Sequence, residues 1–190
     1  GDDVLVPQPS YPLFDLLTRL DGVVSRPYQL DYHGIWSVDR SSVEAALTSS
    51  TRAILVVSPN NPTGSMLRAG DRDWLIDLCA ARGLALIADE VFADYPLARR
   101  PDACSIAAAG DTRALTVSLG GLSKSAGLPQ VKLGWMVVHG PADLVAASLD
   151  RLDLMCDTYL SVSTPVQAAA PQFIEAGRGI RGAIAARLAL

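Results

Sequence analysis

Several features that mark common classes of protein are scarce in this sequence of 190 residues. Lysine and arginine together number 16 against 20 aspartates and glutamates, which gives a formal net charge of -4. The basic residues are scattered along the chain rather than clustered. Such a chain has no basic stripe that could follow a phosphate backbone, so we do not expect a nucleic acid as partner.

Long apolar runs are also missing. No stretch reaches the roughly 20 consecutive apolar residues that a helix needs to cross a bilayer. The first residues, GDDVLV, have neither the basic part nor the apolar part of a signal peptide. We therefore expect a cytoplasmic protein with no membrane partner.

Cysteine is rare, with only Cys79, Cys104 and Cys156. The number is odd, no CxxC pair occurs, and no histidine lies near any of the three. Neither a disulfide framework nor a zinc site is indicated, and we expect no metal at all. The three cysteines are predicted to be buried free thiols.

What the chain does have is a hydrophobic content of 49%, enough for one substantial core. Short runs of β-branched and aliphatic residues end at polar residues, glycine or proline, as buried strands do. These runs predict strands within residues 3–12, 52–64, 84–92, 113–121 and 132–141.

Helical patterns lie between and after these runs. Residues 42–50 predict a helix with Ser41 or Ser42 as its N-cap, and residues 69–83 predict another that ends at Gly83. In that second helix Trp74, Leu75, Leu78 and Cys79 share one face. The alanine-rich residues 165–190 predict a helix broken around Pro171 and the GRG of residues 177–179.

The alternation of strands and helices, with almost continuously apolar strands, predicts an α/β fold. We expect three αβα layers, in which helices cover both faces of a mainly parallel sheet. In such sheets ligands bind at the carboxyl ends of the strands. The segments just after the strands are residues 9–12, 60–64, 89–92 and 118–124. Together they offer an aromatic ring, an amide, a carboxylate and an amine, a set suited to a flat, charged cofactor held by a covalent bond.

Three motifs carry a resemblance to a known family. NNPTG at residues 60–64, ADEV at 88–91 and GLSK at 121–124, in this order and at these separations, resemble the class I/II aminotransferases of fold type I. The resemblance implies pyridoxal 5'-phosphate as cofactor. It also implies that residues 1–165 form an incomplete cofactor-binding large domain, and that 166–190 lead toward an absent small domain. Members usually build their active sites across a homodimer.

The resemblance also implies roles for individual residues. Lys124 would form the Schiff base with the cofactor and later act as the general base at the substrate's Cα. Asp89 would pair with the pyridine nitrogen and keep it protonated. Asn61 would donate a hydrogen bond to O3' of the cofactor, and the ring of Tyr11 would stack on the pyridine.

Some positions depart from the family's pattern. Phe92 stands where a tyrosine usually donates to O3', so that donor is lost. Gly121 replaces a serine that many members use for the phosphate. Lys132 replaces an arginine, which keeps the charge but loses the planar, two-pronged contact. Ser118 and Ser123 are further candidate donors to the phosphate.

The sequence therefore predicts a transaminase that moves an amino group between an amino acid and a 2-oxo acid. Three alternatives stay open: a pyridoxal phosphate-dependent lyase or synthase of the same fold, a cofactor-binding sensory domain of a transcription regulator, and a degenerate domain that no longer binds. The amino acid and the 2-oxo acid cannot be read from these residues.

Overall fold

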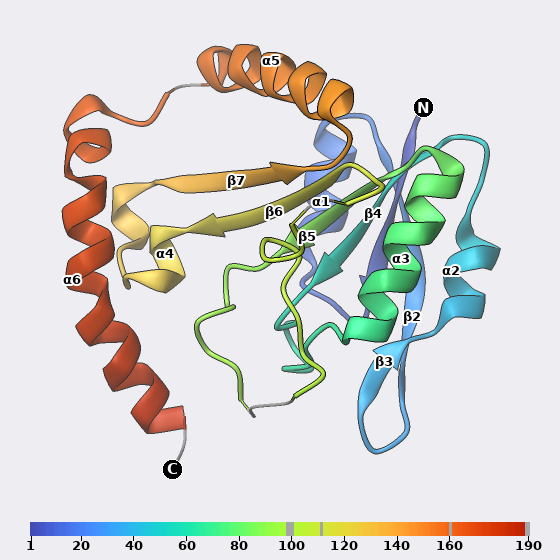
Figure 1. Cartoon of the computed structure of the whole chain (residues 1–190), viewed down its shortest axis with the longest axis horizontal. Coiled ribbons are helices and arrows are strands. Elements are labelled where there is room, and N and C mark those ends of the chain that lie inside the picture. The colour runs from blue at the N-terminus through green and yellow to red at the C-terminus, as the bar shows by residue number, and fades with distance from the viewer. Residues whose placement is uncertain (98–100, 111, 160, 189–190) are drawn as a thin grey trace.

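A seven-stranded sheet runs through the centre of the protein. The computed structural model describes residues 1–97, 101–110, 112–159 and 161–188. Within them the strands lie in the order β3-β2-β1-β4-β5-β6-β7 (Figure 1). Their bounds are β1 Asp3–Gln8, β2 Val24–Tyr32, β3 Trp36–Val38, β4 Thr51–Val57, β5 Ala85–Asp89, β6 Thr116–Gly121 and β7 Gly134–His139.

The sheet is mainly parallel, as predicted. Strand β1 pairs in parallel with β2 and β4, and β5 pairs in parallel with β4 and β6. Only the outer pairs β2·β3 and β6·β7 are antiparallel among the described strands. The five predicted runs contain β1, β5, β6, β7 and all of β4 except its first residue, Thr51, whereas β2 and β3 had not been predicted.

Helices lie on both faces of the sheet, which confirms the three-layer α/β prediction. Helices α2 and α3 lie on one face and α1 on the other, while α5 lies along the β7 edge and α6 stands beside α4, beyond the end of β6 (Figure 1). The bounds are α1 Leu13–Leu20, α2 Arg40–Ala46, α3 Ala69–Arg82, α4 Leu122–Ser125, α5 Ala142–Thr158 and α6 Thr164–Leu188, with a 3₁₀ turn at Pro129–Val131.

The buried core lies between the sheet and α3. Strand residues Leu5, Ile54 and Leu86 are fully buried and belong to the same cluster as Leu75 and Cys79 of α3. Helix α1, in contrast, contains no buried residue. From Asp3 to Pro7 the residues of β1 alternate between buried and half-buried, because successive side chains point to opposite faces. The two faces of the sheet are thus covered unequally.

Helix α3 follows its prediction closely, but the predicted N-cap of α2 was wrong. Helix α3 ends at Gly83, whose φ of 64° is the left-handed conformation that glycine adopts without strain. Helix α2 begins at Arg40 because Asp39, and not Ser41 or Ser42, is its N-cap. The Asp39 carboxylate accepts hydrogen bonds from both serine amides, at 3.0 and 3.2 Å.

The predicted break in the last helix was also wrong. Helix α6 continues through Pro171 and the GRG segment without interruption. Proline removes one backbone donor from a helix, and the bonds on either side can still hold a helix of 25 residues together. Gly177 serves close packing: a Cβ placed there would lie 2.8 Å from the Cβ of Ala126.

The cysteines are free, but only one of them is buried. Cys79 is buried in the core, Cys104 is half-buried and Cys156 is exposed, so the prediction of three buried thiols held for Cys79 alone. Burial raises the pKa of the Cys79 thiol to about 12. The described residues contain no group of His, Cys, Asp or Glu that could hold a metal ion. Nor do they contain a helix that is both long and apolar enough to span a membrane.

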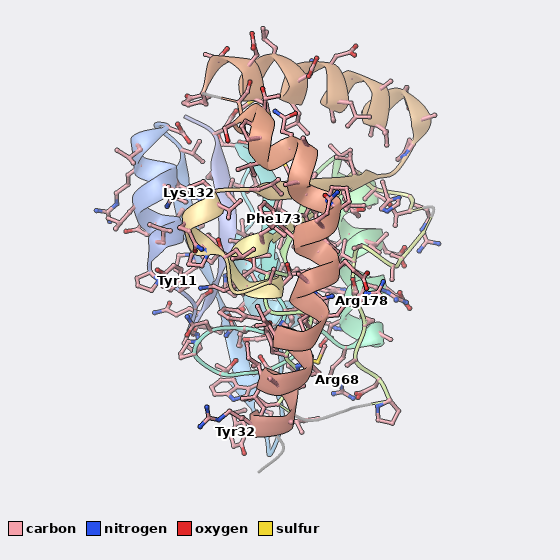
Figure 2. All side chains as sticks on the ribbon, turned by 90° about the vertical axis from the view of Figure 1, so that its left-hand side faces the viewer. Tyr11, Tyr32, Arg68, Lys132, Phe173 and Arg178 are labelled. Atoms are coloured by element: carbon pink, nitrogen blue, oxygen red, sulfur yellow. The ribbon has the colours of Figure 1, made fainter. Side chains whose placement is uncertain are left out.

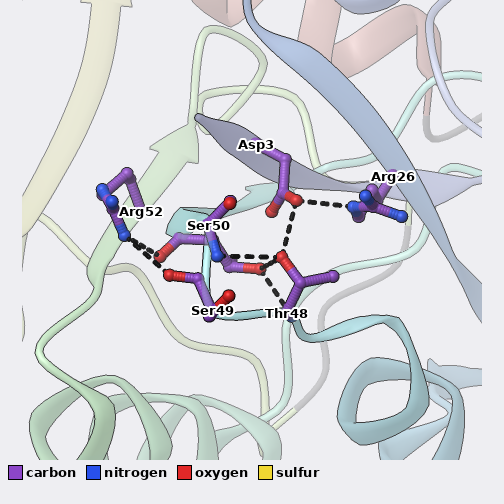
Figure 3. A network of polar contacts seen from close by, with 7 residues as sticks. Asp3, Arg26, Thr48, Ser49, Ser50 and Arg52 are labelled. Atoms are coloured by element: carbon purple, nitrogen blue, oxygen red, sulfur yellow. Dashed lines mark hydrogen bonds and ion pairs between the residues drawn. The ribbon is translucent and has the colours of Figure 1, made fainter. Parts of the chain in front are cut away.

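A buried carboxylate ties the first strand to its neighbours, at the end of the sheet opposite the carboxyl ends. Asp3 is 1% exposed, and its Oδ2 accepts hydrogen bonds from Arg26 Nε at 2.6 Å and Thr48 Oγ1 at 2.8 Å (Figure 3). Burial by itself acts to raise the pKa of Asp3. The contacts with Thr51, Arg26 and Thr48 outweigh it and lower that pKa below its ordinary value.

We expect Asp3→Asn to lower the free energy of unfolding at pH 7 by about 1.5 kcal/mol, the lower end for hydrogen bonds to charged groups, since Arg26 is partly exposed. The native pKa lies below the unfolded one, so the ionised carboxylate contributes in full above the unfolded pKa, near 3.8. That contribution fades as the pH falls through the native pKa. Urea unfolding of both proteins across this range measures the difference.

The matched control is Asp2→Asn. Asp2 pairs with Arg52 at 3.1 Å on the surface, where both side chains are 57% exposed, so its loss should change stability very little. Equal stability of wild type and Asp3→Asn at pH 7 would contradict a stabilising role for the Asp3 carboxylate.

Candidate functional site

Five of the residues expected to bind a cofactor line one pocket. The pocket lies where β4 and β5 end and where α4 follows β6, and its volume is about 360 Å³. This is within the usual range for small-molecule sites. It is lined by Tyr11, Val57, Asn61, Asp89, Val91, Phe92 and Lys124. The chain thus brings a carboxylate, an amine, an amide and two aromatic rings together from segments far apart in the sequence.

Asp89 is the last residue of β5, and its main chain is fixed by the sheet. Its carbonyl accepts from Ser58 N at 2.9 Å, and its Oδ1 accepts from Val91 N at 3.1 Å. Burial raises the pKa of Asp89, and the charge of Glu90 raises it further. The hydrogen bond from Val91 and the positive charge of Lys124 offset only part of this effect. A carboxylate held in this way favours a positively charged or protonated partner.

Lys124 lies in α4, a helix of only four residues directly after β6. Its Nζ lies 5.3 Å from the centre of the Phe92 ring, a cation–π contact. The side chain is exposed in the described chain. The amine is therefore open on one side to an incoming group.

The two adjacent asparagines of NNPTG have different tasks. Asn60 is buried, and its Nδ2 donates to Pro9 O at 3.1 Å and to Thr63 Oγ1 at 2.8 Å. It thereby fixes the segment that carries Tyr11 against the NNPTG turn. Asn61 is exposed and lines the pocket. Of the two side chains, that of Asn61 is the one available to a ligand.

Tyr11 stands at the rim of the pocket and is 47% exposed. Its ring meets that of Phe14 edge-on, with the centroids 6.4 Å apart. Phe14 belongs to α1, so the position of the Tyr11 ring is supported by the helix that follows it. The exposed face of the ring remains available for stacking.

A second, mostly apolar pocket of about 520 Å³ adjoins the first and shares Asn61, Phe92 and Lys124 with it. Ser123 lines this second pocket, as do two residues from the end of α6. The full lining is Pro59, Asn60, Asn61, Pro62, Gly64, Phe92, Tyr95, Leu97, Ser123, Lys124, Gly127, Ile184 and Leu188.

The four residues expected near the cofactor's phosphate do not all line one pocket. Ser123 lines the second pocket, whereas Ser118, Gly121 and Lys132 line neither. The hydroxyl of Ser118 is buried and donates to the Glu90 carboxylate. Gly121 is buried and offers no side chain. Lys132 is exposed, with a left-handed φ of 56°, and lines neither pocket; it lies on the same side of α6 as Tyr11 in Figure 2.

Glu90 is the residue of this region that the sequence pattern did not single out. Its buried carboxylate accepts from Ser105 Oγ at 2.9 Å, from the amides of Ile106 and Ala107 at 2.8 and 3.1 Å, and from Ser118 Oγ. These bonds fasten β6 and the segment around residue 106 to the residue next to Asp89. The sequence offered one signal for Glu90, an acidic residue directly after a buried strand. It could not show the partners of Glu90, because these lie 15 to 28 residues away.

Comparison with known proteins places this geometry in a family. The family model for aminotransferase class I and II matches residues 1–185. The chain belongs to the class I and II aminotransferases. It is 31% identical over 171 residues to an alanine aminotransferase of Mycobacterium tuberculosis, covering 89% of this chain and 39% of that protein. It is 30% identical over 169 residues to a glutamate-pyruvate aminotransferase of Escherichia coli, covering 89% and 41%.

Solved aminotransferase structures have the same fold. A tyrosine aminotransferase from Leishmania infantum matches with a TM-score of 0.82 at 26% identity, over 94% of this chain and 44% of that one. An alanine aminotransferase from Pyrococcus furiosus matches with a TM-score of 0.81 at 24% identity, over 96% and 47%. This chain thus spans less than half the length of these relatives.

We expect Glu90→Gln to lower the free energy of unfolding by about 2 kcal/mol, because glutamine supplies one acceptor oxygen where Glu90 supplies two and turns an NH₂ group toward donors. Urea unfolding at pH 7 measures the loss. Glu44→Gln, on the exposed side of α2, is the control and should leave stability unchanged. A Glu90→Gln protein as stable as the control would mean that water replaces the lost contacts.

Proposed function

We propose that this chain carries the cofactor-binding part of a pyridoxal 5'-phosphate-dependent aminotransferase that moves an amino group between an amino acid and a 2-oxo acid. The observation that carries the proposal is the convergence of Lys124, Asp89 and Asn61 on one pocket, in a chain that belongs to this family. The names of relatives such as the alanine aminotransferase support transamination as the reaction class.

The residues of the pocket fit the ring of this cofactor. Burial raises the pKa of Asp89, and among the described residues Lys124 is the positive charge that acts on it, so a protonated ring nitrogen would complete its surroundings. Asn61 supplies an amide, and Tyr11 an aromatic face. The phosphate end is matched less fully by the described residues. Ser123 and Lys132 are the groups we propose for it, with further contacts from outside this chain.

Pyridoxal phosphate, when bound, supplies an electron sink for the charge left on the substrate's Cα after its proton is removed. This chain's own residues would do the rest. Lys124 would hold the cofactor by a covalent bond and, once freed, would move the proton at Cα. Asp89 would keep the ring nitrogen protonated. Asn61 would donate a hydrogen bond, and Tyr11 would stack on the ring.

The further properties of the protein belong to the same proposal. We infer that it acts as a homodimer in the cytoplasm, on amino-acid and 2-oxo-acid substrates, with no nucleic acid as partner. The absence of any described helix able to span a membrane is compatible with this location. Exposed apolar residues on β7 and α5, such as Trp135 and Leu154, are compatible with burial against further protein.

We expect borohydride treatment of the full-length protein with pyridoxal 5'-phosphate to fix the cofactor on Lys124. Lys124 and Lys132 are the two lysines of this sequence, and of the two only Lys124 lines the pocket. Peptide mapping by mass spectrometry identifies the modified residue. Lys132→Arg should be labelled as wild type is, and Lys124→Arg should not be labelled. Labelling confined to Lys132 would overturn the proposal.

We expect Phe92→Tyr to lower the pKa of the imine that Lys124 forms with the cofactor. A phenol at this place would add a donor to the cofactor's charged O3', which weakens the hold on the imine proton. One such bond corresponds to a shift of about one to two pKa units. Titration of the visible absorption measures it, with Phe173→Tyr on α6 as control because Phe173 lines neither pocket. Coinciding curves for Phe92→Tyr and wild type would show that another donor already fills the place.

A further inference from the structure

The helix that carries Lys124 is too short to hold itself in place. Helix α4 has four residues, and a helix leaves its last four carbonyl groups without a partner inside the helix. One of these, the carbonyl of Leu122, is taken by the amides of Ala126 and Leu128, both at 3.1 Å. Of the other three, the carbonyls of Lys124 and Ser125 accept hydrogen bonds from elsewhere in the chain.

Two side chains from distant segments satisfy them. Tyr95 donates its hydroxyl to the carbonyl of Lys124 itself, at 2.7 Å. Arg181, which belongs to α6, donates through Nη1 to the carbonyl of Ser125 at 2.8 Å. Hydrogen bonds from a guanidinium are stronger than those between neutral groups. The main chain at Lys124 is therefore held from two sides.

The same two side chains link the three segments that surround the pocket. Tyr95 follows Asp89 by six residues, so its bond joins the Asp89 segment to the Lys124 turn. Arg181 also lies 4.0 Å from Asp94 and donates to Ile174 O at 3.4 Å, which holds its side chain at 21% exposure. Figure 2 shows α6 running in front of the short α4, and the bond from Arg181 to Ser125 O joins the two helices.

Close packing fixes the distance between the two helices. Gly177 lies one turn before Arg181 on α6 and is buried against Ala126, the residue that caps α4. Any side chain at Gly177 would meet both Ala126 and the guanidinium of Arg181, at 2.8 and 3.1 Å. The backbone approach at this point is thus what brings Arg181 within reach of Ser125.

We propose that Tyr95 and Arg181 are positioning residues for Lys124, and that through Arg181 the placement of α6 determines the placement of the reactive amine. The inference rests on the proposed function of Lys124 as the residue that captures the cofactor. Displacements of about 1 Å can reduce reaction rates by up to about a hundredfold. Loss of either contact should therefore slow covalent capture more than it weakens cofactor affinity.

The test compares four variants of the full-length protein, freed of cofactor. Tyr95→Phe and Arg181→Met each remove one contact, and Arg181→Lys keeps a charged donor. Arg178→Met is the matched control, because Arg178 also lies on α6 but is 71% exposed and pairs only with Glu175 among the described contacts. Pyridoxal 5'-phosphate itself is the probe, and stopped-flow absorption separates its affinity from its rate of covalent capture.

We expect capture to be about tenfold slower in Tyr95→Phe and Arg181→Met, with the affinity changed by less than about twofold. Arg181→Lys should recover most of the rate, and Arg178→Met should match wild type. Wild-type capture rates in both Tyr95→Phe and Arg181→Met would overturn the inference. So would a rate in Arg181→Lys as low as in Arg181→Met, since a donor at Ser125 O would then not be what matters.

Hydrogen exchange in the cofactor-free protein supplies a second readout. The amides of Ala126 and Leu128, which report on α4, should exchange faster in Tyr95→Phe and Arg181→Met than in the control. Unchanged exchange would overturn the inference even if an arginine variant folds poorly, since Tyr95→Phe removes only one oxygen atom. If the wild-type protein does not capture the cofactor at Lys124, the proposed function fails. The hydrogen-exchange rates still show in that case whether the contacts of Tyr95 and Arg181 hold α4 in place.

Discussion

The site depends on the hydrogen bonds that place the end of β5 between its two neighbours. Ser58 N donates to the carbonyl of Asp89 at 2.9 Å, and Glu90 N donates to the carbonyl of Leu119 at 3.0 Å. These two bonds continue the parallel ladder one step beyond the regular strand. Because they leave Asp89 almost no freedom, the segments that follow β4 and β6 meet it at a fixed spacing.

The two adjacent acidic residues at the end of β5, Asp89 and Glu90, have different surroundings. Glu90 points into the protein, where Ser105, Ser118 and two amides satisfy its carboxylate. Asp89 points into the pocket with one amide donor, that of Val91. Successive side chains of an extended chain face opposite ways, so one acid can be fully satisfied while its neighbour stays available to a ligand. The satisfied acid also raises the pKa of the available one.

Much of this arrangement follows from local sequence, and the remainder does not. The apolar runs predicted five of the seven described strands and, through the rule for parallel sheets, the meeting of Asp89, Asn61 and Lys124. Glu90 and Arg181 were missed because their partners lie 15 to 56 residues away, and no periodicity reports such contacts. Ser118 was a candidate donor to the phosphate, and a strand's pattern does not report the bond that its hydroxyl makes to Glu90, 28 residues away.

Two aromatic residues follow Asp89, and both contact Lys124. Phe92 has no hydroxyl and instead presents its ring to the Lys124 amine. The nearest phenol along the chain, that of Tyr95, is already committed to the Lys124 carbonyl. Tyr95 therefore cannot supply the hydroxyl that Phe92 lacks without breaking its own hydrogen bond to the Lys124 carbonyl. Apart from the Tyr11 hydroxyl, the neutral side-chain donor that the described residues present to the pocket is Asn61, because the neighbouring Asn60 is buried and donates to Pro9 O and Thr63 Oγ1.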